Sequence, residues 1–289
     1  MFLLSLVNGI STGSLYALIA LGPSLIYGIL RILDIANAAG LTLGAYVGLK
    51  VFKLTGSLAL GLLAAVLASA IFGLILQRFL YRPILNRGPL IPLIASIGTF
   101  IAMEEVFRLV FGPYPQTFPA KIPIHTLRFG GAFITGVQII ILVTGLIVLL
   151  GTWFALKRSR LGLYWRATSQ DRPTAEAMGI DTGGVIAAIF AIGYALAAVS
   201  GVLLGINYNT VYPTMGDIPA YKMLAIIVLG GLGNPLGTIA AAMLIGLVET
   251  FVVSYAGFVL PRDAIAFIVL IIILLARPQG LLGKAKASR

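Results

Sequence analysis

Cysteine is absent from this chain of 289 residues, and histidine occurs once, at His125. Without cysteine neither a disulfide nor a thiolate metal site can form, and a single histidine supports neither a metal cluster nor a serine–histidine–acid arrangement. No G-x-x-x-x-G-K-[ST] loop occurs, so the chain is not expected to hydrolyse ATP itself. These absences predict that the protein is not an enzyme and binds no cofactor or metal.

Charged residues are also scarce. They make up 10% of the chain, whereas 60% of the residues are hydrophobic and the mean hydropathy is +1.06. Soluble domains carry about 25% charged residues, so this chain lacks the polar side chains needed to cover its surface in water. The composition predicts an all-α, polytopic membrane protein with one transmembrane domain over residues 1–289.

Long apolar runs mark the candidate membrane segments, because a helix of roughly 20 residues crosses the hydrocarbon. They cover residues 4–29, 36–53, 57–77, 90–111, 133–156, 184–206, 219–233, 236–254 and 257–276. The first has no basic residue before it and no cleavage region, which favours a retained helix over a signal peptide. Segments 36–53 and 219–233 are short and glycine-rich, which is typical of broken or re-entrant helices. We therefore expect eight full crossings, with nine as the alternative.

Basic residues cluster in three regions, which hold 12 of the 20 lysines and arginines. The regions comprise Arg78, Arg82 and Arg87; Lys157, Arg158, Arg160, Arg166 and Arg172; and Arg277, Lys284, Lys286 and Arg289. Loops rich in lysine and arginine face the cytoplasm, so these regions, including the C-terminus, are expected on the cytoplasmic side of the plasma (inner) membrane. The net charge of +11 is then explained by topology and lipid contact, and no nucleic-acid partner is expected.

The largest hydrophilic stretch runs from Lys157 to Gly184. Within it, residues 173–178 are predicted to form a short helix, with Asp171 as its cap and Gly179 as its C-terminal stop. A helix this short does not persist alone in water, so it needs a supporting surface. It is either an amphipathic segment on lipid headgroups or a docking element for a cytoplasmic protein.

The same stretch contains a motif that extends to the rest of the chain. "SQDRP" followed by "AEAMGID" is similar to a loop that reads "QD-R-x-A-A-x-x-M-G-I" in permeases of the branched-chain amino acid ABC importer family. Other segments also resemble that family: "NGISTGSLYALIALGPSLIYGILRI" (8–32), "SIGTFIAMEEVFRLVFG" (96–112), "YKMLAIIVLGGLGNPLGTIAAAMLIGLVE" (221–249) and "RPQGLLG" (277–283). Together they span nearly the whole chain.

The resemblance implies a permease that moves hydrophobic, branched-chain or neutral amino acids inward. Its protein partners are then a second, related permease, two cytoplasmic ATP-binding subunits and an extracytoplasmic solute-binding protein. The permease also contacts the lipid bilayer in which it lies. The coupling loop lies within 157–183, and its ATPase-contacting residues are Ala175, Glu176, Ala177, Met178 and Gly179. Related permeases carry urea, short amides, nucleosides or sugars, and an ion-gradient-driven secondary transporter is the alternative from another class.

Charged residues inside the apolar segments form two expected pairs. Glu104 and Arg108 are four residues apart and share a helix face, so they are expected to pair; the resemblance gives a glutamate and an arginine at these positions. Glu105 departs from the family, in which asparagine is common there. Lys222 and Glu249 flank the glycine-rich stretch 230–237 and are able to pair across that hairpin. The Glu104–Arg108 pair is either structural or in contact with the solute.

Asp34 and Asn37 form a polar patch after the first segment, where the family commonly shows "I-N-F-A-H-G". Here the segment reads Leu-Asp-Ile-Ala-Asn-Ala (33–38). One interpretation is a helix cap, in which either side chain accepts from free N–H groups of the next helix. The other is a broken helix beside the pathway, with its N-terminus facing polar groups of the solute.

Small residues recur every four positions and predict close helix packing. The stripes are Gly9, Gly13 and Ala17; Gly40, Gly44 and Gly48; and Gly193, Ala197, Gly201 and Gly205. The stretch "GGLGNPLG" (230–237) lacks the strand–loop–helix setting of a phosphate-binding loop. It is instead expected to break a helix and let two backbones approach.

Overall fold

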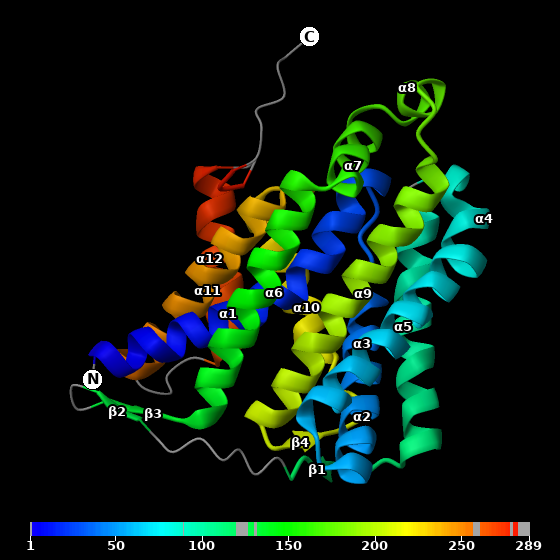
Figure 1. Ribbon diagram of the computed structural model, residues 1–289. Coiled ribbons are helices and arrows are strands. Elements are labelled where there is room, and N and C mark those ends of the chain that lie inside the picture. The colour runs from blue at the N-terminus through cyan, green and yellow to red at the C-terminus, as the bar shows by residue number, and fades with distance from the viewer. Residues whose placement is uncertain are drawn as a thin grey trace.

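The computed structural model of the chain describes residues 2–88, 90–119, 127–129, 132–256, 261–277 and 280–282. His125, residues 257–260 of the last predicted segment, and Lys284, Lys286 and Arg289 of the basic tail lie outside the described residues. The described part is a helical bundle with little strand (Figure 1).

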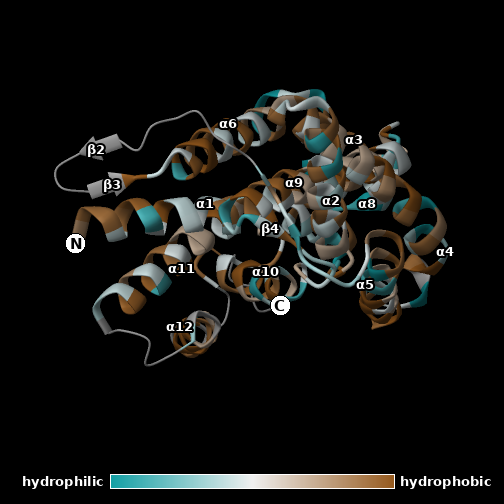
Figure 2. Cartoon of the chain, turned by 90° about the horizontal axis from the view of Figure 1, so that it is seen from below, coloured by the Kyte–Doolittle hydropathy of each residue, from teal (hydrophilic) through white to brown (hydrophobic). Residues whose placement is uncertain are grey.

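Helices coincide with all nine predicted apolar segments. They are α1 (Phe2–Leu30), α2 (Asn37–Thr55), α3 (Leu58–Ile75), α5 (Leu90–Phe111), α6 (Gly136–Arg158), α9 (Thr182–Asn207), α10 (Asp217–Gly230), α11 (Pro235–Ala256) and α12 (Arg262–Ala276). Six of them, α1, α3, α5, α6, α9 and α11, are long and apolar enough to cross a membrane, and α12 contains a shorter apolar helix. The hydropathy colouring is brown along most of these helices, including those at the periphery (Figure 2). The polytopic all-α fold is confirmed.

Short elements occupy the two ends of the bundle. At one end α3 continues into the π-helix η1 (Leu76–Tyr81), α4 (Arg82–Ile84) and the 3₁₀ turn η2 (Leu85–Arg87), and α7 (Arg160–Gln170) and α8 (Arg172–Ala177) project beyond the bundle (Figure 1). At the other end β1 (Gln116–Thr117) pairs antiparallel with β4 (Thr210–Val211), and β2 (Leu127–Phe129) pairs with β3 (Ala132–Ile134). These are called the arm end and the strand end below.

Polar side chains cap several helices where the sequence offers them. The hydroxyl of Ser57 accepts from the first turn of α3, and the carboxylate of Asp181 accepts from Gly184 N in the first turn of α9. Thr135 and Gln138 form a reciprocal capping box at the start of α6. These contacts satisfy N–H groups that a helix leaves free at its start.

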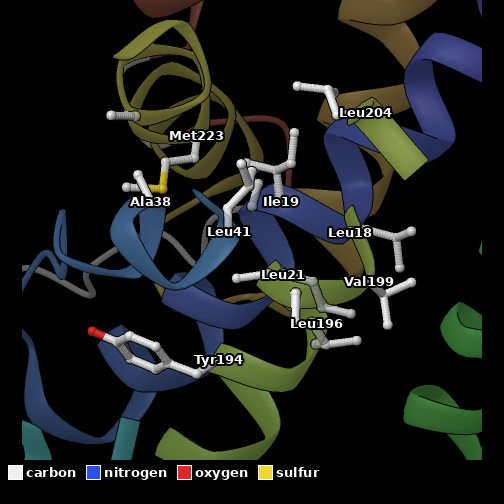
Figure 3. Close-up of a cluster of buried hydrophobic side chains, with 14 of the residues drawn as sticks. Leu18, Ile19, Leu21, Ala38, Leu41, Tyr194, Leu196, Val199, Leu204 and Met223 are labelled. Atoms are coloured by element: carbon white, nitrogen blue, oxygen red, sulfur yellow. The ribbon is translucent and has the colours of Figure 1, made fainter. Parts of the chain in front are cut away.

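The bundle core is built from α1, α2, α9 and α10. Figure 3 shows Leu18, Ile19 and Leu21 of α1 facing Leu196, Val199 and Leu204 of α9, with Leu41 of α2 and Met223 of α10 nearby. α1 and α9 are mostly buried, whereas α3, α5 and α6 expose most of their apolar side chains. The outward apolar faces suit lipid or a neighbouring subunit.

The two short helices α2 and α10 begin beside each other inside the bundle. A methyl group on Gly216, just before α10, would lie 3.0 Å from the carbonyl oxygen of Ala38 in the first turn of α2. α2 then runs to the strand end, where Phe52 stacks on Phe118, and α10 runs to the arm end, where Gly233 beyond it contacts Gly28. Neither α2 nor α10 is among the six described helices that are long and apolar enough to cross a membrane, which is consistent with the broken or re-entrant segments expected at 36–53 and 219–233.

The small-residue stripes lie at the closest helix contacts. Gly44 of α2 packs on Ala198 of α9, Gly22 of α1 packs on Gly193 of α9, and Gly246 of α11 packs on Gly13 of α1. The glycine-rich stretch between α10 and α11 brings Gly230 and Gly237 into backbone contact. The predicted packing role of these glycines is confirmed within the bundle.

Within α1, Pro23 has no N–H to donate to Ile19, so one main-chain hydrogen bond is missing there.

Gly44→Ala is expected to destabilise the protein because the new methyl carbon would lie 2.5 Å from the Cα atom of Ala198. Overpacking of this kind costs about 1–3 kcal/mol. Gly98→Ala in α5 is the matched control, since a methyl group there meets nothing within 4 Å. The melting temperature in detergent should fall for Gly44→Ala and stay level or rise for Gly98→Ala. Equal melting temperatures for the two variants would contradict the packing assignment.

Candidate functional site

The α7–α8 arm (Arg160–Ala177) is anchored to the bundle by Trp165. Its indole Nε1 donates to the carbonyl oxygen of Leu25 in α1 over 3.2 Å, and its ring lies against Gly28. Ser159 begins α7 by accepting from Gly162 N at 3.1 Å. Sequence reasoning missed α7; the Ser159 cap and the three-residue spacing of the buried Gly162, Trp165 and Thr168 were its signal.

The tip of the arm is α8, whose observed bounds differ by one residue from the predicted 173–178. Asp171 stands at the N-cap position, but its carboxylate accepts from the Thr174 hydroxyl rather than from a backbone N–H group. Gly179 ends the helix with a φ of 84°, a left-handed conformation that suits glycine. Ala175 is buried, so the predicted coupling residues do not all face outward.

Glu176 holds the arm together, whereas Met178 is left free to make contacts. The carboxylate of Glu176 accepts from the Thr182 hydroxyl at 2.5 Å and from Arg172 Nε at 2.9 Å. These two hydrogen bonds lower the pKa of Glu176, the one from Thr182 more strongly. Met178 is 80% exposed. The arm therefore presents one large apolar side chain, flanked by Ala177 and Gly179, beyond the bundle.

Lys222 and Glu249 form a buried ion pair between α10 and α11. Lys222 Nζ lies 2.9 Å from Glu249 Oε1, and the two side chains are 5% and 2% exposed. Tyr16 of α1 joins them: its hydroxyl donates to Glu249 Oε2 at 2.7 Å and accepts from Lys222 Nζ at 2.5 Å. The pairing across the hairpin is thus observed, and Tyr16 is a third member that sequence reasoning missed.

A cavity of about 430 Å³ opens beside this ion pair, between α1, α9 and α10. We call it the tyrosine cavity; its lining includes Tyr16, Ile19, Leu204, Tyr208, Tyr212, Met215, Ile218 and Lys222. Tyr208 and Tyr212 lie next to β4, so the cavity extends from the strand end toward the ion pair. Small-molecule sites have volumes of about 300–1,000 Å³ and mostly apolar walls with a few polar groups. The cavity can hold a small amphiphile between aromatic and aliphatic walls, with the Lys222–Glu249 ion pair at its inner end.

Asp34 is fully buried between three segments. Its carboxylate accepts from the Tyr81 hydroxyl at 2.5 Å and from the Tyr194 hydroxyl at 3.0 Å. Backbone N–H groups at the start of α2, from Ala36 and Asn37, also interact with it. Asp34 therefore ties the segment before α2 to η1 and α9.

Asn37 is buried at the first residue of α2, and its Nδ2 atom has no hydrogen-bond partner among the described residues. It does not act as the cap that the sequence allowed. An unsatisfied amide at a helix start beside the start of α10 is consistent with a polar position in the bundle interior.

The prediction that Arg108 pairs with Glu104 is wrong, because its partner is Glu105. Arg108 Nη1 lies 2.6 Å from Glu105 Oε1, on the exposed side of α5. Glu104 turns instead toward Asp217 at the start of α10, and its buried Oε1 atom has no hydrogen-bond partner in the described part of the chain. Positions three and four residues apart are both within reach on a helix, and here the neighbouring glutamate, on the outer side with Arg108, takes the contact.

The chain is similar to membrane transport proteins over nearly its whole length. A family model described as "Branched-chain amino acid transport system / permease component" matches residues 5–275. The chain is 35% identical to the Pseudomonas aeruginosa "High-affinity branched-chain amino acid transport system permease protein BraD", over all of this chain and 98% of BraD. It is 32% identical to Escherichia coli LivH, whose name has the same wording, over all of this chain and 97% of LivH.

A more distant relative is the "Probable branched-chain amino acid transport permease protein LivH" of Methanocaldococcus jannaschii. It is 27% identical over 96% of this chain and 91% of that protein. No solved structure matches the chain.

Proposed function

This chain belongs to the family of branched-chain amino acid transport permease components, and from that membership we propose that it is the membrane subunit of an ABC importer through which amino acids enter the cytoplasm. The observation that carries the proposal is similarity over the full length to permeases named for branched-chain amino acid transport. Members of this family are transport permeases and not enzymes. The whole of 1–289 then acts as one permease domain, with its coupling loop within 157–183.

The arm end is proposed to face the cytoplasm. Described basic residues of all three predicted regions gather there, on η1 and α4, on α7 and α8, and at Arg277 after α12 (Figure 1). Loops rich in lysine and arginine remain on the cytoplasmic side. This orientation places the C-terminus in the cytoplasm and the strand end outside.

The arm is proposed to dock on ATP-binding subunits, which supply the energy that this chain does not generate. Met178 offers a flexible, polarisable apolar contact suited to a groove in a partner, and Glu176 keeps α8 in place. Trp165 joins the arm to α1, so a movement of the arm is passed to the bundle as a rigid-body shift. A second, related permease and a solute-binding protein at the strand end complete the importer.

The solute pathway is proposed to include the tyrosine cavity, with Lys222 and Glu249 at its inner end. A neutral amino acid carries an apolar side chain on a zwitterionic backbone, and the cavity combines a buried ion pair, aromatic rings and aliphatic walls. Asp34, Asn37, Glu104 and Arg108 support the bundle around this path: Asp34 and Asn37 at the start of α2, Glu104 near the start of α10, and Arg108 on the outer side of α5.

Ile218→Trp is expected to reduce uptake because Ile218 lines the tyrosine cavity and is 49% exposed. Added bulk costs about 1–3 kcal/mol, which corresponds to a reduction of about 5- to 150-fold. Tyr221→Trp is the matched control: Tyr221 is on the same helix, is 60% exposed and is outside the cavity lining. ATP-dependent uptake by the reconstituted importer measures the effect. Unchanged uptake by Ile218→Trp, with normal uptake by Tyr221→Trp, would exclude this path.

The proposed function is tested by reconstituting the chain in liposomes with candidate permease, ATP-binding and solute-binding partners. Uptake of radiolabelled leucine, alanine, urea, a nucleoside and ribose is compared with and without ATP. We expect ATP-dependent uptake of leucine or another neutral amino acid. Uptake driven by an ion gradient without ATP-binding subunits would contradict the importer, and ATP-driven uptake of only a non-amino-acid solute would contradict the substrate.

A further inference from the structure

A second cavity, of about 360 Å³, lies at the arm end between the end of α3 and the start of α9. Its lining includes Gln77, Arg78, Arg82, Arg172, Asp181, Gly183 and Gly184. We propose that it binds the phosphate group of an anionic phospholipid. The proposal rests on the charge of the cavity walls and on the apolar surface that leads into it.

The walls of this cavity carry excess positive charge. Arg78 and Arg82 make no salt bridge with any described residue, and Arg172 uses Nε for Glu176, which leaves its terminal N–H groups for other contacts. Among the described residues of the lining Asp181 is the one carboxylate, and it accepts from Gly184 N at 3.1 Å. Guanidinium groups match phosphate in a two-pronged geometry, and the N-terminal end of the 26-residue helix α9 adds partial positive charge.

An apolar strip runs along α3 to these arginines. Its exposed members are Leu67 at 63%, Ile71 at 56%, Ile75 at 48% and Phe79 at 73%. Leu67, Ile71 and Ile75 recur every four residues and so share one face of α3, and Phe79 continues the strip in η1, between Arg78 and Arg82. A phosphate in the cavity can thus belong to a lipid whose acyl chains lie along α3, with the headgroup at the depth where basic residues meet anionic lipid.

The site is connected to the arm through Arg172. This residue belongs to the cavity lining and also holds Glu176 of α8 at 2.9 Å. A bound phosphate would share Arg172 with Glu176 and so link α8 to η1 and α9. The effect of such a link on ATPase docking rests on the proposed function, whereas lipid binding itself does not.

The test compares the purified chain in nanodiscs of phosphatidylcholine alone and with phosphatidylglycerol. The anionic lipid is expected to raise the melting temperature, and Arg78→Gln with Arg82→Gln should remove more than half of that increase. Arg158→Gln with Arg160→Gln is the matched control, since these arginines lie at the same end and outside the cavity lining. This control should keep the increase.

Three results would overturn the site: no increase in the wild type, equal loss in both double variants, or the same increase from inorganic phosphate added to phosphatidylcholine nanodiscs. The first result would mean that the anionic lipid does not bind, and the second would mean a general attraction to the basic surface. The third would assign the cavity to free phosphate. If the glutamine variant does not fold, Arg78→Lys with Arg82→Lys keeps the charge. That variant should keep only part of the lipid-induced increase in melting temperature, because lysine cannot make the bidentate hydrogen bonds that arginine makes to phosphate. An increase equal to that of the wild type would contradict bidentate binding by the arginines.

Discussion

Met178→Asp is expected to weaken attachment of the ATP-binding subunits by about 30-fold or more and to reduce ATP-driven uptake accordingly. Met178 is 80% exposed at the tip of the arm and makes the most prominent apolar surface there. Central apolar contacts of an interface contribute 2 kcal/mol or more when removed, and each 1.4 kcal/mol corresponds to tenfold in affinity. A buried aspartate without a partner adds a desolvation cost. Co-purification of the ATP-binding subunits measures attachment directly.

Leu54→Asp is the matched control for Met178→Asp. Leu54 is 85% exposed near the end of α2, at the strand end, so the same chemical change is made far from the arm. It should leave attachment unchanged, and Met178→Leu should retain most of it because the apolar contact is kept. Normal co-purification and uptake with Met178→Asp would show that α8 is not the docking element and that it lies on lipid headgroups instead.

Lys222→Met is expected to destabilise the protein by about 3–5 kcal/mol, because it leaves the carboxylate of Glu249 buried without its cation. Glu249 is 1% exposed and would retain only the Tyr16 hydroxyl of the three-residue cluster. The loss is expected as a lower melting temperature and a smaller monodisperse fraction in detergent. It should be the largest single-residue effect on stability among the variants considered.

The double variant Lys222→Met with Glu249→Leu separates the ion pair from the rest of the packing. Replacing both members by apolar residues of similar size is often neutral or stabilising, so this variant should recover most of the lost melting temperature. Together with the wild type and the single variants Lys222→Met and Glu249→Leu, it forms a double-mutant cycle. If the double variant is no more stable than Lys222→Met, the pair does not behave as a buried ion pair. If it is stable but transports poorly, Lys222 and Glu249 also act on the solute.

Hydropathy predicted the helices well because the length of each apolar segment is a local property of the sequence. The bounds of α5 were predicted to the residue, and the start of α2 was displaced by one. The break at 230–237 was also predictable, since glycine and proline act locally. Glycine stripes predicted close contacts, but not the partners: which helix faces Gly44 depends on the whole bundle.

Partners far apart in the sequence were the main features that could not be predicted. Asp34 was recognised as unusual, but its contacts with Tyr81 and Tyr194 join residues 47 and 160 positions away. Tyr16 is 233 residues from Glu249. Nothing in a local pattern distinguishes these tyrosines from others, and the choice of Glu105 over Glu104 by Arg108 depends on which side of α5 faces α10.

Pro23 separates α1 into an arm-side segment and a cavity-side segment. Trp165 contacts Leu25 and Gly28 in the arm-side segment, whereas Tyr16 and Ile19 at the tyrosine cavity belong to the cavity-side segment. The missing main-chain bond at Pro23 lies between them, and a helix bends at least cost where such a bond is absent. α1 is therefore easiest to bend between the Trp165 contact and the tyrosine cavity, and the 2.8 Å hydrogen bond between the Ser24 and Thr238 hydroxyls joins its arm-side segment to α11.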